Sequence, residues 1–124
     1  MQQPQVRTPA GTFEGLWADD AQSIQVFKGI AYAAPPVGPM RFKPPAPKPS
    51  VGGVTLAQSD PKPGWQAHSE DAFVWSRGVF PRSEDCLYLN VWAPKAGHPI
   101  SGDLPVMVWF HGGSHTSGWG HHPL

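Results

Sequence analysis

The chemically most informative residues are two consecutive glycines that follow a run of apolar side chains. The run covers residues 106–110, opens after Pro105 and closes with His111-Gly112-Gly113-Ser114. Glycine lacks a Cβ, so the backbone can turn sharply there and leave its N–H groups exposed. Exposed N–H groups stabilise the negative charge that develops on the carbonyl oxygen during acyl transfer. The pattern therefore predicts half of an acyl-transfer site, although a plain strand-ending turn has the same local pattern.

A nucleophile for such a site is harder to find in the chain. Ser114 lies beside His115, which suggests a nucleophile and a base. Neighbouring residues in a turn rarely bring a hydroxyl and an imidazole nitrogen within hydrogen-bond distance, and no third group is fixed to orient the base. We therefore assign no nucleophile to this pair.

Four histidines near the carboxyl end raise the alternative of a metal site. They are His111, His115, His121 and His122, with no carboxylate or cysteine among them. Zinc sites usually hold their ligands on rigid elements and support them with a second shell of hydrogen bonds. A solvated, disordered end is the favoured interpretation, so we predict no metal and no cofactor.

Two strands are expected around the glycine turn. The apolar run 106–110 is typical of a strand buried on both faces. In residues 87–92, Leu87, Leu89 and Val91 alternate with Tyr88, Asn90 and Trp92, which predicts a strand that ends at Pro94. The connection between them, residues 95–103, is polar and short, so the two strands could be neighbours in one sheet.

The amino-terminal half is expected to be short strands and irregular loops. We expect a hairpin formed by residues 11–17 and 23–27 around a turn at Asp19-Asp20. We expect a disordered lead-in at residues 1–10. Residues 28–42 predict an irregular crossing anchored by Ile30, Tyr32 and Phe42. The proline-rich stretch 43–64 predicts an extended connection rather than a ligand for an aromatic groove, and Ser69 is a candidate cap for one helical turn.

Composition excludes several classes of function. The 14 glycines and 16 prolines among 124 residues are about twice the average usage, which predicts many turns and little helix. The formal net charge is zero, so we expect neither a nucleic-acid partner nor a basic membrane-binding surface. No apolar stretch is long enough to span a bilayer. The amino terminus has no signal-peptide pattern, and the single cysteine excludes an intrachain disulfide, which together favour the cytoplasm.

Three stretches, taken together, resemble the type-B carboxylesterases, the α/β-hydrolase group that includes the cholinesterases. They are FKGIAYA at 27–33 with PPVG at 35–38 and Arg41-Phe42, SEDCLYLNVWAP at 83–94, and PVMVWFHGGSH at 105–115. Their order and approximate spacing also match. The resemblance implies the α/β class. It also implies that residues 11–124 are a partial α/β-hydrolase domain, truncated after the glycine turn.

The resemblance also implies roles for individual residues. The backbone N–H groups of Gly113 and Ser114 would form the oxyanion hole, with Gly112 supporting the turn. Arg41 and Glu84 match positions that form a structural ion pair. The family often has glycine in place of Ser114 and an aromatic residue in place of His115. Cys86 matches a cysteine that commonly bridges to an upstream Cys-x-Gln, where this chain has Gly64-Trp65-Gln66.

The function implied is that of an amino-terminal segment of a serine carboxylic-ester hydrolase acting on a small-molecule ester. Such enzymes place the nucleophile in a G-x-S-x-G elbow beyond the oxyanion turn, and these residues contain no such elbow. The triad acid and histidine also lie further on in the family, so we expect the segment alone to be inactive. The alternative is a non-catalytic cholinesterase-like binding or adhesion module, since some family members use the fold in that way.

Overall fold

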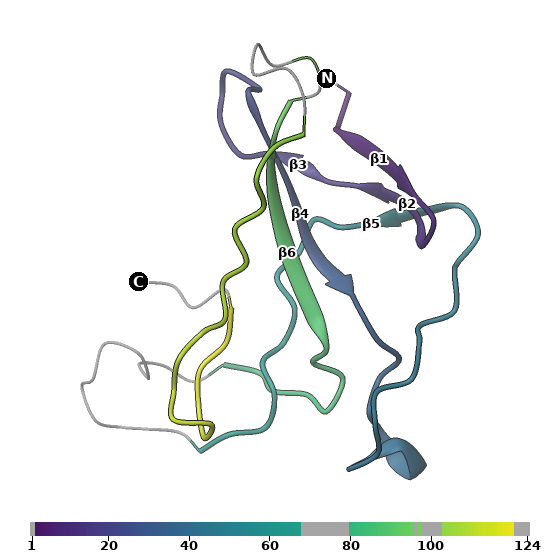
Figure 1. The fold of residues 1–124 in the computed structure, drawn as a ribbon, viewed down its shortest axis with the longest axis vertical. Helices are drawn as coiled ribbons and strands as arrows, with labels where there is room; N and C mark the ends of the chain where they lie inside the picture. Colours follow the sequence, from purple (N-terminus) through teal and green to yellow (C-terminus); the bar gives the residue numbers. More distant parts are fainter. Residues whose placement is uncertain (1, 68–79, 96, 98–102, 121–124) are drawn as a thin grey trace.

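The computed structural model describes residues 2–67, 80–95, 97 and 103–120. Six strands and one 3₁₀ turn lie in this part of the chain (Figure 1). They are β1 (Gln5–Thr8), β2 (Gly11–Glu14), β3 (Leu16–Trp17), β4 (Ile24–Ala31), η1 (Gly38–Met40), β5 (Val54–Leu56) and β6 (Tyr88–Pro94). The strands form two three-stranded sheets, in the orders β1-β2-β5 and β3-β4-β6. The expectation of short strands, loops and little helix is confirmed for the described residues.

The first sheet corrects two expectations. The lead-in predicted as disordered contains β1, which pairs antiparallel with β2 from Gln5↔Glu14 to Thr8↔Gly11. All four residues of β1 are exposed, so the strand has no buried face to produce an alternating pattern, and backbone pairing holds it. Within the proline-rich connection, β5 adds a parallel pair to β2. Strands held at an exposed edge leave little trace in the sequence.

The predicted hairpin of residues 11–17 and 23–27 is confirmed in its inner part by the antiparallel pairing of β3 with β4, whereas Gly11–Glu14 form β2 and pair with β1 and β5. Asp19 closes the turn between them, because its Oδ1 accepts hydrogen bonds from the N–H groups of Ser23 and Ile24, each at 2.9 Å. The hydroxyl of Ser23 donates to the other carboxylate oxygen. These donors, the Ser23 hydroxyl first, hold the pKa of Asp19 below its usual value.

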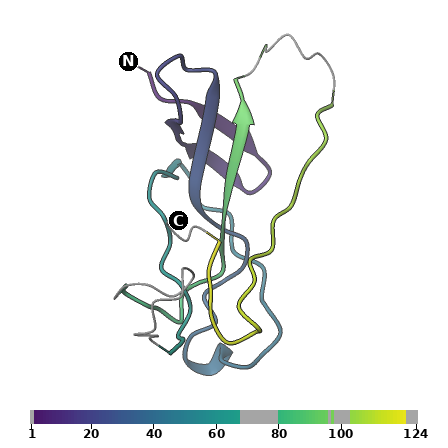
Figure 2. The same cartoon turned by 90° about the vertical axis from the view of Figure 1, so that its left-hand side faces the viewer.

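The second sheet is completed by the long antiparallel pair of β4 and β6, seen side by side in Figure 2. The strand predicted in residues 87–92 with an end at Pro94 is thus confirmed as β6. The core lies where the two sheets meet: Phe13, Phe27 and Ala57 are buried together, with Ile30 packed against them. Tyr32 and Phe42, the other predicted anchors, are 57 % and 95 % exposed, so that part of the prediction was wrong.

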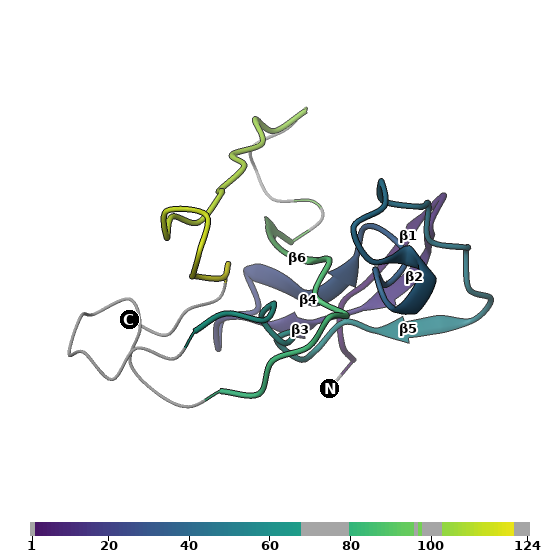
Figure 3. The same cartoon turned by 90° about the horizontal axis from the view of Figure 1, so that it is seen from below.

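The apolar run before the glycine turn differs most from expectation. Residues 103–110 are extended but form no strand. Within the described chain they have no sheet partner, and they run apart from both sheets (Figures 1 and 3). Val106 is 85 % and Met107 92 % exposed. A parallel strand is stable only with neighbouring strands and covering helices on both faces, which the described residues do not provide. The predicted pairing with residues 87–92 is also wrong, because β6 is an edge strand of its sheet and residues 103–110 belong to neither sheet.

Candidate oxyanion turn

The glycine turn closes on the carbonyl oxygen of Gly113. That oxygen accepts hydrogen bonds from the N–H groups of Thr116 at 2.9 Å and Ser117 at 3.0 Å. The hydroxyls of the same two residues also donate to it, at 3.1 and 3.3 Å. Four donors fix the direction of this carbonyl. Because the C=O and N–H of a trans peptide point in opposite directions, the N–H of Ser114 points away from these donors.

The backbone angles show where glycine is required. Gly113 has a φ of +125°, and a Cβ there would lie 1.9 Å from the carbonyl oxygen of Ser117. A Cβ at Gly112 would have no atom within 4 Å. Packing inside the turn therefore requires glycine at position 113. It does not require glycine at position 112, where a side chain would extend into the open space outside the turn.

Ser114 and His115 both adopt left-handed backbone angles, with φ of +53° and +59°. Such angles cost a residue with a Cβ about 1–2 kcal/mol. Ser114 nevertheless adopts the geometry at a position where the family often has glycine. This departure is accommodated in the turn at the cost of strain.

The predicted donors are free in this geometry. Within the described part of the chain, the N–H groups of Gly113 and Ser114 have no hydrogen-bond acceptor, and both residues are exposed. Two adjacent N–H groups without an internal partner are suited to an anionic oxygen.

Gln66 anchors the far end of the turn, a role that the sequence reasoning missed. The N–H of Gly118 donates to Gln66 Oε1 at 2.8 Å, and Gln66 Nε2 donates to the Gly118 carbonyl at 3.3 Å. The next residue, Trp119, is buried, and its ring centroid lies 4.0 Å from that of Phe80. The turn is thus held by segments 64–66 and 80–82 and not by a sheet.

Arg41 and Glu84 are brought together as an ion pair. Arg41 Nε lies 2.6 Å from Glu84 Oε1, with side chains 55 % and 32 % exposed. An exposed pair of this kind contributes at most about 1 kcal/mol to stability. The pair links the loop after β4 to the segment before β6, which is the arrangement expected of a structural ion pair.

Cys86 lies next to the position where an upstream cysteine would be expected. A Cβ on Gly64 would be 3.4 Å from Cys86 Sγ. Burial, then the neighbouring carboxylates of Asp85 and Glu84, raise the pKa of the Cys86 thiol. The thiol is therefore a weak nucleophile at neutral pH.

The alternative assignments gain no geometric support. No hydrogen bond joins Ser114 to His115, and His111 Nδ1 instead lies 2.8 Å from the Gly112 carbonyl oxygen. In the described ranges no group of three or more histidine, cysteine or acidic residues is arranged to hold a metal. His121 and His122 lie outside those ranges, as do Ser69 and most of the connection 95–103. The described chain also has no helix of the length and apolarity needed to cross a membrane.

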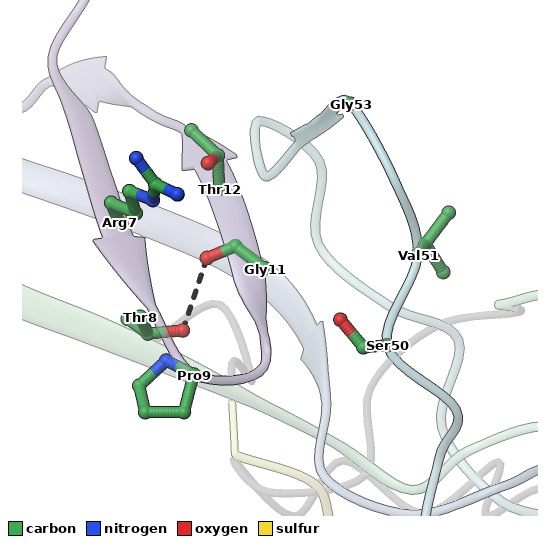
Figure 4. A pocket seen from close by; sticks show the side chains of 8 residues that line it. All are labelled: Arg7, Thr8, Pro9, Gly11, Thr12, Ser50, Val51 and Gly53. Carbon is green, nitrogen blue, oxygen red and sulfur yellow. Dashed lines mark hydrogen bonds between the residues drawn. The ribbon is translucent and has the colours of Figure 1, made fainter.

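A depression on the first sheet contains no residue of the turn (Figure 4). It lies between the β1–β2 hairpin and the loop before β5, and Thr8 Oγ1 closes the hairpin by donating to the Gly11 carbonyl at 3.1 Å. Its lining is Arg7, Thr8, Pro9, Gly11, Thr12, Ser50, Val51 and Gly53. No nucleophile–base pair is found among these residues.

Comparison with known proteins decides the family. The profile of the carboxylesterase family matches residues 2–122. The chain belongs to the carboxylesterase family. Acetylcholinesterase-1 of Trittame loki is 41 % identical over 118 residues, covering 93 % of this chain and 21 % of the relative. Fumonisin B1 esterase of Sphingopyxis macrogoltabida is 36 % identical over 113 residues, covering 91 % and 19 %.

Solved structures agree with this carboxylesterase assignment. A PNB esterase superimposes with a TM-score of 0.81 at 36 % identity, over 98 % of this chain and 24 % of that protein. The fold is the amino-terminal part of an α/β-hydrolase, as the resemblance implied. This carboxylesterase chain spans about a fifth of the length of the relatives named.

Proposed function

We propose that this chain supplies the oxyanion-hole turn of a serine hydrolase that acts on small-molecule carboxylic esters. The backbone N–H groups of Gly113 and Ser114 are the donors, and Gly112 leaves room for the carbonyl group to approach. The observation that carries the proposal is the pair of adjacent, exposed N–H groups without an internal acceptor. The esterase names of the relatives support the choice of ester substrates.

The proposed chemistry is stabilisation of a tetrahedral intermediate. When a nucleophile attacks the ester carbonyl carbon, the oxygen gains a negative charge, and the two N–H groups would donate hydrogen bonds to it. Losing one such donor costs about 3–4 kcal/mol of transition-state stabilisation. The donation is from the backbone, so the side chain of Ser114 takes no part.

The nucleophile, its base and the triad acid are not supplied by these residues in this proposal. The sequence contains no G-x-S-x-G elbow. We therefore expect the 124-residue chain alone to hydrolyse a p-nitrophenyl ester no faster than a buffer blank. Turnover that disappears in Ser114→Ala would contradict this assignment and favour the serine hydroxyl as a nucleophile.

The direct test uses a chimera, a PNB esterase whose matching amino-terminal quarter is replaced by residues 2–120 of this chain. The chimera is expected to hydrolyse p-nitrophenyl acetate above the blank. Ser114→Ala and Ser114→Gly should keep this activity because both retain the N–H donor. Gly113→Ala should lower kcat/KM about 100-fold or more, because a Cβ there would displace the turn.

Gly120→Ala is the matched control, since a Cβ at Gly120 meets no atom within 4 Å. Its activity should equal that of the unmodified chimera. A chimera that is folded by circular dichroism and yet inactive would overturn the proposal and favour the non-catalytic binding module.

A further inference from the structure

We propose that Gln66 is a positioning residue of the oxyanion turn: its side-chain amide fixes Gly118 and, through Gly118, the Gly112–Gly113 peptide that carries the first donor. This inference rests on the proposed function for its catalytic consequence. The positional part concerns the turn itself and can be tested without any activity.

The first step is the contact between Gln66 and Gly118. The amide both accepts from the Gly118 N–H and donates to the Gly118 carbonyl, as a neighbouring strand would. The two residues are 52 positions apart in sequence. A two-point contact restricts both the position and the rotation of the peptide, which a single hydrogen bond does not.

The second step is the contact between Gly118 and the start of the turn. Gly118 has a φ of +97°, and a Cβ there would lie 2.4 Å from the Gly112 carbonyl oxygen and 2.9 Å from His111 Nδ1. The Gly112 carbonyl therefore packs directly over the Gly118 α-carbon. The peptide that joins Gly112 to Gly113 carries the first donor N–H. Fixing Gly118 thus limits the movement of that donor.

The third step is that Gln66 is itself held on both sides. Gln66 Nε2 also donates to the Gly64 carbonyl at 3.2 Å. The guanidinium of Arg82 donates from Nη1 to the Gln66 carbonyl and lies over the rings of Trp65 and Phe80, at 5.9 and 5.7 Å from their centroids. The amide is consequently presented in one orientation.

The chemistry of the contact distinguishes glutamine from its isosteres. Glutamate at 66 would keep the acceptor for the Gly118 N–H but would lose the donor, so a carboxylate oxygen would face the carbonyl oxygens of Gly64 and Gly118. Methionine would fill the same volume with neither donor nor acceptor. Both substitutions should free the turn although they preserve side-chain size.

Hydrogen–deuterium exchange on the 124-residue chain tests the positional claim. In Gln66→Met, peptides covering residues 111–118 should exchange at least about tenfold faster than in the unmodified chain. Gln58→Met is the matched control, because Gln58 Nε2 donates to Glu14 Oε1 and the Gly15 carbonyl, both at 3.2 Å, away from the turn. Equal exchange of the turn in all three proteins would overturn the proposal.

Kinetics of the chimera test the catalytic consequence. Gln66→Met and Gln66→Glu should lower kcat by about 10- to 100-fold with KM changed by less than about twofold, as misplacement of a group acting in the transition state predicts. Gln58→Met should lower Tm without this drop in kcat. If kcat fell equally in the Gln66 variants and in Gln58→Met, Gln66 would contribute only to overall stability and the positioning role would be refuted. An inactive chimera would refute the proposed function, while exchange would still decide the positional claim.

Discussion

The side-chain oxygen of Asn90 accepts a hydrogen bond from the backbone N–H of Gly29 at 2.8 Å, across the irregular step between β4 and β6. The ladder breaks there between Phe27 and Ile30, and Gly29 has a φ of +71°. The Gly29 N–H is thus satisfied by a side chain in place of a strand partner. The contact joins the FKGIAYA and SEDCLYLNVWAP stretches, so the two motifs form one structural unit.

Replacement of Asn90 tests this contact. Asn90→Ala would leave the Gly29 N–H without its acceptor and would also remove the donor to Asp60 Oδ1, at 3.0 Å. We expect a loss of about 1–3 kcal/mol of unfolding free energy, measured as a lowered Tm of the chimera. Gln25→Ala, which removes one hydrogen bond to the Pro94 carbonyl on the same strand pair, should have the smaller effect. Equal effects would show that Asn90 has no special role at the irregular step.

Gly64→Cys is expected to form a disulfide with Cys86 on oxidation. A Cβ at 64 would lie 4.0 Å from Cys86 Cβ, within the range of about 3.5–4.5 Å that disulfides require. Closing this loop should stabilise the segment by about 2–4 kcal/mol. Thiol titration of the denatured, oxidised protein should detect no free thiol.

The control for that disulfide is Gly52→Cys, because a Cβ at Gly52 meets no atom within 4 Å. That variant should keep both thiols free under dilute oxidising conditions. Free thiols in Gly64→Cys would mean that segments 64–66 and 83–86 do not lie together in solution.

Acid should weaken the β3–β4 hairpin through Asp19. The pKa of Asp19 is lowered in the folded chain, so the ionised carboxylate stabilises the fold above the unfolded pKa of about 3.9. That contribution is lost as the pH falls through the lower folded pKa. In Asp19→Asn, stability between neutral pH and pH 3 should change less than in the parent chimera, as measured by Tm at each pH. Parallel curves for the two proteins would contradict the assignment.

The exposed residues before the turn should make the isolated chain associate. Met107 and Phe110 are 92 % and 85 % exposed on an extended segment, a pattern typical of aggregation-prone edges. Met107→Lys with Phe110→Lys should raise the soluble fraction of the 124-residue chain, measured by light scattering against concentration. Lysine at Gln2 and Ser59 is the matched control and should change little, because both residues are polar and exposed and their side chains make no hydrogen bond within the described residues.

The sequence predicted what depends on local pattern. The alternation in residues 87–92 identified β6, and the Asp19 turn identified the β3–β4 hairpin, because each has a buried or capped feature that its own residues encode. Arg41 and Glu84, inferred from resemblance, meet in the structure. β1 and β5 were missed because their residues are mostly exposed and their pairing is set by the backbone.

For residues 106–110 the sequence pattern was clear, but the predicted strand did not form. Their apolar pattern describes an environment with strands on either side and helices above and below, and these surroundings are absent from the described residues. Gln66 escaped the sequence reasoning for a different reason. A glutamine that binds a backbone 52 residues away has no local signature, and only the position of the absent cysteine nearby drew attention to the segment.

The contact of Gly118 with the Gly112 carbonyl has a consequence for directed evolution of such esterases. A library that varies the oxyanion loop should hold residues 113 and 118 as glycine, since any Cβ there meets a main-chain oxygen at 1.9 or 2.4 Å. Residue 112 can be randomised without a clash inside the loop, because a Cβ there meets no atom within 4 Å, whereas residue 114 has a left-handed φ of +53° that favours glycine or asparagine. If the proposed function holds, substrate selection would then act on the positions next to the ester, while the two fixed glycines preserve the loop.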